Sequence, residues 1–145
     1  MTQRRTTALA STAAAFAVTL ACAWLLLPAR VPVVLQEGLV LDRWQYVVGV
    51  GLGGWALAVG SGGLGIAVDS LVRTVGSGAA GPSDLEGLLE AWVLLCAVVA
   101  VWLQIAAGSG SPGWLPWSQV LVVLVGFTGA AVLLVARALG GGRRR

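Results

Sequence analysis

Four long apolar segments, at residues 7–27, 46–68, 88–107 and 117–139, dominate the pattern of the chain. Each has roughly the 20 residues that a helix needs to cross the ~30 Å hydrocarbon core of a bilayer. Apolar and polar positions do not alternate within them, as they would in the strands of a membrane barrel. The pattern predicts an all-α integral membrane protein with four transmembrane helices, built as one domain over residues 1–145.

The connecting stretches carry residues that end or begin helices. Pro28 and Pro32 follow the first segment and lack the backbone donors that a continuing helix would need. Ser83 and Glu86 have the spacing of a capping box, so we expect the third helix to begin near residue 84. A run of glycine, serine and proline over residues 108–113 predicts a turn before the fourth helix.

The first segment has an alternative interpretation, because Arg4 and Arg5 before an apolar stretch are also typical of a secretory signal peptide. The stretch is longer than the roughly 7–15 apolar residues of such peptides. No cleavage site of small residues follows Leu27. We therefore expect this segment to be retained as a helix.

Composition excludes several classes of protein. Hydrophobic residues make up 58% of the chain and charged residues 10%, whereas soluble domains carry about 25% charged residues. The chain has no histidine and two cysteines, which excludes a Ser-His-Asp triad, a histidine-ligated zinc site and a four-cysteine site. We expect no catalytic, cofactor-binding or metal site, and we expect Cys22 and Cys96 to pack as small apolar residues.

Arginine positions predict the orientation of the helices, because cytoplasmic loops of membrane proteins are enriched in positive charge. Two arginines, Arg30 and Arg43, lie in the connector of residues 28–45, and the other seven lie on the opposite side of the predicted topology. Both termini are therefore predicted to be cytoplasmic and this connector extracytoplasmic, in a multi-pass protein of the cell membrane. The use of arginine without lysine, beside many alanines, glycines and valines, is typical of a GC-rich bacterial genome.

Six aromatic residues are predicted to lie near the extracytoplasmic ends of the helices. Such rings prefer the headgroup level of a bilayer, so an interfacial belt is the simpler interpretation. The alternative is that the belt and the first connector together form an outward docking surface. The six residues are Trp24, Trp44, Tyr46, Trp102, Trp114 and Trp117.

Glycines in the second segment match two different motifs. Residues 49–54 and 60–65 both read G-x-G-x-x-G, the pattern of dinucleotide-binding turns between a strand and a helix. Both matches lie inside one apolar span, where no strand precedes them. In lipid, small residues four apart let helices approach closely, so we expect Gly49 and Gly53 to pack against another helix.

Ionisable and polar residues near or within the spans have structural and functional interpretations. Glu86 and Glu90 would stabilise the positive end of the third helix, or alternatively carry protons or cations in a transporter. Asp69 and Arg73, four residues apart, are expected to form an exposed pair at the membrane edge. Gln104 is expected to hydrogen-bond between helices, with a substrate pathway as the alternative.

The first connector carries the most informative motif. Residues 27–32 read Leu-Pro-Ala-Arg-Val-Pro and residues 42–44 read Asp-Arg-Trp. This stretch resembles the bacterial membrane family called domain of unknown function 1648, found at the front of Sdp-type toxin immunity proteins. The family pattern is Leu-Pro-x-x-Ile-Pro, a polar run with a histidine, and Gly-x-Pro-Asp-x-Trp/Phe. The chain departs from it at Val34, Leu39 and Leu41, which stand where the family has its histidine, glycine and second proline.

The resemblance implies a non-enzymatic membrane protein of immunity or signalling type, whose outer loop recognises a toxin, a peptide or a membrane partner. Because Val34 stands where the family has its histidine, the resemblance does not extend to any function that needs this histidine. The candidate recognition residues are Pro28, Arg30, Pro32, Asp42, Arg43 and Trp44. The residues themselves also fit a purely structural connector, stiffened by its prolines and anchored by its tryptophan.

The rival expectation is a small transporter, or a subunit of one. The two classes differ in the residues they require, since a proton-coupled carrier would need Glu86 or Glu90 and a docking protein would need the connector. The expected partners are the lipid bilayer and a membrane protein or peptide, and an oligomer is compatible with the composition. Nucleic-acid binding is not expected, because the basic tail at residues 143–145 is short and is explained by attraction to anionic lipid.

Overall fold

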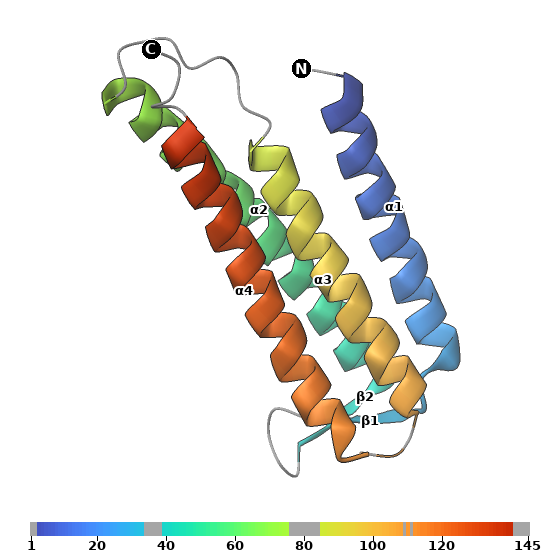
Figure 1. Cartoon of the computed structure of the whole chain (residues 1–145). Helices are drawn as coiled ribbons and strands as arrows, with labels where there is room; N and C mark the ends of the chain where they lie inside the picture. The colour runs from blue at the N-terminus through green and yellow to red at the C-terminus, as the bar shows by residue number, and fades with distance from the viewer. Residues whose placement is uncertain (1–2, 34–38, 76–84, 109, 111, 141–145) are drawn as a thin grey trace.

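The chain is a bundle of four helices that run side by side along one axis (Figure 1). The structure, a computed structural model, describes residues 3–33, 39–75, 85–108, 110 and 112–140. The helices are α1 (Gln3–Leu26), α2 (Arg43–Val75), α3 (Leu85–Ala107) and α4 (Trp114–Gly140). All four are long and apolar enough to cross a membrane by length and composition. The all-α prediction is confirmed, and each helix contains or closely matches one predicted segment.

The two ends of the bundle differ. The start of α1 and the end of α4 lie at one end, and two short strands lie at the other, which we call the hairpin end (Figure 1). The strands β1 (Arg30–Pro32) and β2 (Val40–Asp42) pair antiparallel, with Arg30 opposite Asp42 and Pro32 opposite Val40. The sequence pattern did not predict them, because three-residue strands leave no periodic signal.

Local chemistry explains where the helices end. The amide of Leu27 still donates to the carbonyl of Ala23 at 3.0 Å, and Pro28 then stops the helix because it has no amide to donate. Gly108 follows α3 with a φ of 62°, the left-handed conformation that ends many helices at a glycine. The predicted capping residue Ser83 lies outside the described residues, and α3 begins at Leu85.

Helix α2 is longer than the segment that predicts it. It has 33 residues, which is about 50 Å at 1.5 Å per residue. The additional turns at its end carry Asp69 and Arg73, whose four-residue spacing stabilises a helix. This end of α2 therefore extends past the apolar part of the bundle.

Helix α3 occupies the centre of the bundle and packs against α1, α2 and α4. Within the described part of the chain, α1 and α4 lie on either side of α3 and do not contact each other (Figure 1). Buried residues form two clusters. The cluster at the hairpin end is Ala23, Leu27, Val31 and Val101, and the cluster in the middle is Phe16, Ala58 and Leu94.

Close helix packing depends on small residues in α2 and α4. A Cβ at Gly54 would lie 2.7 Å from Cζ of Phe16 on α1, and a Cβ at Gly65 would lie 3.2 Å from the backbone of Glu86 on α3. On α4, a Cβ at Gly129 would lie 2.7 Å from Nε1 of Trp92. The indole of Trp92 also donates to the carbonyl of Gly126 at 2.9 Å. Larger side chains at these glycines would hold the helices apart.

The prediction that Gly49 and Gly53 make such a contact is wrong for the helices of this chain. No described atom outside their own helix turn lies within 4 Å of the position that a Cβ would take at either residue. The buried small residues of α2 are instead Gly54, Ala58, Gly62 and Gly65. These lie on another face of the helix, and Gly49 and Gly53 line an open cleft instead.

Candidate functional site

The predicted recognition connector folds into the β1–β2 hairpin and is fixed to the bundle by one apolar side chain. Val31, in the middle of β1, is fully buried among Ala23, Leu27 and Val101. The carbonyl of Pro32 accepts a hydrogen bond from Nε2 of Gln104 on α3, at 3.4 Å. Gln104 thus bonds to the hairpin, and among the described residues it makes no bond to another helix, contrary to the prediction.

Arg43 ties the hairpin to the end of α1. Its Nη1 donates to the carbonyl of Leu27 at 3.2 Å, and its backbone amide donates to the carbonyl of Ala29 at 2.9 Å. The guanidinium carbon lies 5.5 Å from the centre of the Trp24 ring, a cation–π distance. Arg43 was predicted as a recognition residue, and the structure places its side chain in contacts that hold the hairpin.

The start of α2 is capped across the hairpin strand. The amide of Asp42 donates to Oε1 of Gln45 at 3.1 Å, which is the back-reaching bond of a capping box. Asp42 was predicted as a recognition residue. Its backbone joins the cap, and its carboxylate remains exposed at the surface.

Arg30 and Asp42 are displayed side by side on the exposed side of the hairpin. They are directly opposite in the strand register, and both are exposed. In the described part of the chain, neither side chain forms an ion pair. Trp44, in the first turn of α2, is also exposed. The hairpin backbone thus places Arg30 and Asp42 next to each other, and neither charge is used in packing.

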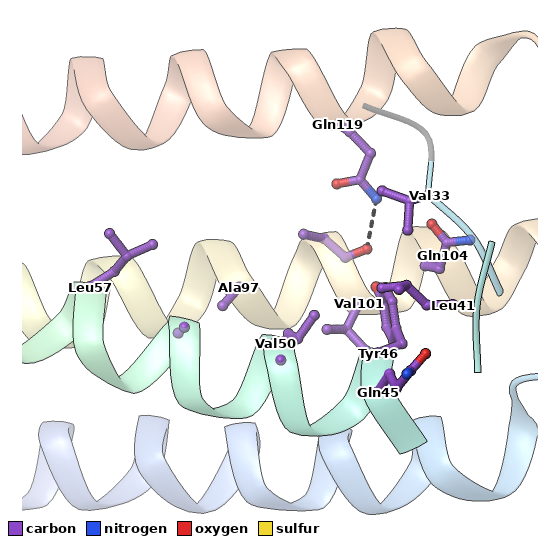
Figure 2. A pocket seen from close by; sticks show the side chains of 14 residues that line it. Val33, Leu41, Gln45, Tyr46, Val50, Leu57, Ala97, Val101, Gln104 and Gln119 are labelled. Atoms are coloured by element: carbon purple, nitrogen blue, oxygen red, sulfur yellow. Dashed lines mark hydrogen bonds between the residues drawn. The ribbon is translucent and has the colours of Figure 1, made fainter. Parts of the chain in front are cut away.

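An apolar cleft of about 460 Å³ opens next to the hairpin, between α2 and α4 and alongside α3 (Figure 2). Its volume is in the range of small-molecule pockets, about 300–1,000 Å³. The walls are glycines of α2 and aliphatic residues of α2 and α3, and none of the lining residues that the structure describes is charged. The lining residues are Val33, Leu41, Gln45, Tyr46, Gly49, Val50, Gly53, Gly54, Leu57, Ala97, Ala100, Val101, Gln104 and Gln119.

Polar groups lie toward the hairpin end of this cleft, and Leu57 and Ala97 lie at its other end (Figure 2). Gln119 is the single lining residue from α4, and its Nε2 donates to the carbonyl of Ala100 at 3.0 Å. Gln104 is only 3% exposed and donates to Pro32, but among the described residues none donates to its Oε1. The cleft therefore combines apolar walls with acceptor oxygens at one end.

The far end of the bundle holds a charged cluster that corrects a prediction. Asp69 and Arg73 were expected to form an exposed pair, but Asp69 is only 8% exposed. Its Oδ2 lies 2.6 Å from Nη2 of Arg73, and its Oδ1 accepts from Nε and Nη2 of Arg137 at 2.9 and 2.6 Å. Arg137 comes from α4, so the carboxylate joins two helices. Spacing within α2 identified the local partner, and nothing in the sequence pointed to the distant one.

The two glutamates of α3 lie at its interface with α2. Glu86 is in the first turn of α3, as predicted, and its backbone lies against Gly65. The side chain of Glu90 packs against Gly62, at the position that a Cβ of that residue would occupy. The acidic residues of α3 therefore lie where two helices meet closely. Both have further interactions within the chain.

The arrangement can bind and present groups, but the described residues contain no cluster of three or more metal-ligating side chains. Cys22 and Cys96 are free, and Sγ of Cys96 lies 3.5 Å from the Cβ position of Gly126, in an apolar helix contact. The aromatic residues expected at one membrane surface all fall within two turns of the hairpin end of their helices.

Comparison with protein-family models, curated proteins and solved structures finds no match to this chain. The resemblance of the connector to the domain of unknown function 1648 accordingly rests on its short motifs. The functional argument therefore depends on the hairpin, the cleft and the charged residues themselves.

Proposed function

We propose that the chain is a non-enzymatic, multi-pass protein of a bacterial cell membrane whose outer hairpin recognises a peptide or toxin, as an immunity or signalling protein would. Four helices of sufficient length and apolarity support insertion. The arginine distribution supports a topology with both termini in the cytoplasm and the hairpin outside. In this topology the aromatic residues lie at the outer headgroup level, and Asp69 with Arg73 lies at the inner one.

One observation carries the recognition role. Arg30 and Asp42 present opposite charges side by side on a hairpin whose backbone is fixed by Val31 and Arg43. A hairpin whose backbone is already held in place needs less ordering when a partner binds, and complementary charges supply specificity and fast association. Because Arg30 and Asp42 take no part in packing, their charges are available to bind a partner.

Topology is tested first, with reporter fusions. An alkaline phosphatase fused after Arg145 should be inactive, and one inserted within the connector of residues 28–45 should be active, because the enzyme matures only outside the cytoplasm. The opposite result would place the hairpin in the cytoplasm and remove the proposed recognition role.

Recognition is tested by survival of a bacterial host that expresses the chain during challenge with a panel of membrane-active peptide toxins. The wild-type chain should raise survival against at least one peptide, and Arg30→Ala and Asp42→Ala should abolish that gain at normal membrane abundance. Val40→Ala, a change at an exposed, uncharged position on the same hairpin, is the matched control and should retain it.

A charge exchange separates recognition from a structural role of the pair. The double variant Arg30→Asp with Asp42→Arg keeps both charges opposite each other but reverses their order. Recognition by a partner predicts that protection stays lost in this variant, whereas a structural role predicts that it returns. Protection that is unchanged in both alanine variants, or absent from the wild-type chain, contradicts the proposal.

A small transporter, or a transporter subunit, is the second candidate, and one observation favours it. Glu90 lies in the α2–α3 interface against Gly62, inside a predicted span, and acidic residues in spans often carry protons or cations. This function predicts that Glu90→Gln abolishes efflux of a cationic dye such as ethidium from expressing cells, while Asp42→Ala leaves it unchanged. The recognition function predicts no efflux in either case.

A further inference from the structure

The cleft between α2 and α4 has a polarity that changes along the bundle axis. Its hairpin end carries the amides of Gln104 and Gln119 and the phenol of Tyr46, and its other end is lined by aliphatic side chains such as Leu57 (Figure 2). In the proposed topology, the polar end lies near the outer headgroups and the apolar end lies toward the bilayer centre. A lipid of the outer leaflet has the same order of polar and apolar parts.

The polar end of the cleft offers acceptor oxygens to a ligand that can donate a hydrogen bond. Gln104 is 3% exposed, and its Nε2 is used by the carbonyl of Pro32. Its Oε1 accepts nothing from the described residues, and buried polar atoms are rarely left without a partner because the cost is substantial. In Gln119, likewise, Nε2 donates to the carbonyl of Ala100, and no donor to its Oε1 is found among the described residues. A ligand with a hydroxyl or amide N–H would satisfy these oxygens.

The lining also specifies that the ligand is neutral. None of the described residues that line the cleft carries a charge, so among them an anionic or cationic head would be desolvated without a counter-charge, at high cost. The lateral opening follows from α4, which contributes only Gln119 to the lining. A ligand can therefore reach the cleft from within the bilayer.

We infer that this cleft binds one neutral, hydroxyl-bearing lipid of the acylglycerol class, with its hydroxyl groups on Gln104 and Gln119 and its acyl chain along Val50, Gly53 and Leu57. The inference rests on the membrane placement proposed above, and not on recognition by the hairpin. The site accounts for glycine at positions 49 and 53, because larger side chains there would project into the space that the acyl chain takes.

The test uses the purified full-length chain in lipid nanodiscs and a monoacylglycerol whose acyl chain carries a diazirine. Photolabelling followed by peptide mass spectrometry should modify residues 45–57 or 97–104 saturably, and unlabelled monoacylglycerol should compete. The methyl ester of the same photoreactive acid lacks hydroxyl donors and should label these segments about tenfold less, the effect of losing one or two hydrogen bonds.

Two variants test the position of the ligand. Gly53→Leu fills the cleft and should lower specific labelling about tenfold. Gly60→Leu is the matched control, since it makes the same change on the same helix, also with no described atom within 4 Å of its Cβ position, but outside the cleft. Ala97→Phe narrows the cleft from α3, and it gives the same answer if Gly53→Leu does not fold by circular dichroism.

A third variant tests the chemistry of the head. Gln104→Met removes one of the two acceptors with little change in size, so the difference in labelling between the monoacylglycerol and the methyl ester should shrink but not vanish. Labelling that is spread evenly over the lipid-facing surfaces, or that is equal in Gly53→Leu and the wild-type chain, overturns the proposal, as does equal competition by an apolar helical peptide.

Arg30→Ala and Asp42→Ala should leave labelling unchanged, so failure of the recognition role is seen separately. Extraction of the chain from membranes by alkaline carbonate would reveal failure of the membrane placement.

Discussion

Arg137 on α4 holds Asp69 on α2 through two hydrogen bonds to a single carboxylate oxygen, Nε at 2.9 Å and Nη2 at 2.6 Å. The second oxygen of Asp69 is held by Arg73 of its own helix. One carboxylate thereby fixes α4 to α2 at the end of the bundle opposite the hairpin. At the hairpin end, the same two helices are separated by the cleft.

Removal of Arg137 should destabilise the bundle more than removal of Arg73. The side chain of Arg137 is 20% exposed and that of Arg73 is 51% exposed. We expect Arg137→Ala to lower the free energy of unfolding by about 3 kcal/mol, as is typical of a buried ion pair that loses one partner, and Arg73→Ala to lower it by less than about 1 kcal/mol. Unfolding by sodium dodecyl sulfate, followed by circular dichroism, measures both. Equal losses would show that the link between helices contributes little.

An alanine at Gly65 should separate α2 from α3. Its Cβ would lie 3.1 Å from Cδ1 of Leu89 and 3.2 Å from backbone atoms of Glu86, which have little freedom to move. We expect Gly65→Ala to cost about 1–3 kcal/mol in the same titration. Gly60→Ala meets no described atom within 4 Å and should gain up to about 1 kcal/mol from helix propensity. Similar effects of the two changes would contradict the packing.

The two arginines of the connector, Arg30 on β1 and Arg43 at the start of α2, should differ in their contribution to stability. Arg43 bonds to the carbonyl of Leu27 and lies over Trp24, so Arg43→Ala should cost about 2 kcal/mol, from a charged hydrogen bond and a cation–π contact. Arg30 is exposed, and Arg30→Ala should change stability by less than about 0.5 kcal/mol. A greater loss on removal of Arg30 would make that residue structural, and would weaken the proposed recognition role.

Trp92 should stabilise the α3–α4 contact through its indole. Trp92→Phe removes the hydrogen bond to the carbonyl of Gly126 and should cost about 1 kcal/mol, within the range measured for hydrogen bonds between membrane helices. Trp117→Phe is the matched control, because that side chain is 77% exposed and should change little. A comparable loss at both positions would indicate a general effect of removing an indole from the surface, and not the bond to Gly126.

The helices could be predicted from the sequence because their signal is local. About 20 apolar residues in succession identify a span whatever its neighbours are, and prolines and glycines mark its ends. The hairpin could not be predicted in this way, because its six paired residues are held by contacts that come from elsewhere in the chain, such as Val31 with Val101 and Pro32 with Gln104.

The glycines and the charged cluster show the same limit. Gly49 and Gly53 match the familiar small-residue spacing, but so do Gly54, Ala58 and Gly62. Spacing alone does not say which face of α2 packs against α1 and α3, since that depends on partners such as Phe16 on α1 and Glu90 on α3. Arg137 is 68 residues away from Asp69, so no pattern within either helix connects them.

Because Asp69 has one partner four residues away and another on the last helix, its charge is accommodated at every stage of assembly. Arg73 is present as soon as α2 has formed, whereas Arg137 arrives only when α4 has been synthesised. Arg73 can therefore neutralise Asp69 in the newly made helix α2. Arg137 then adds the contact that joins α4 to α2. The two partners of this carboxylate thus become available in the order in which their helices are synthesised.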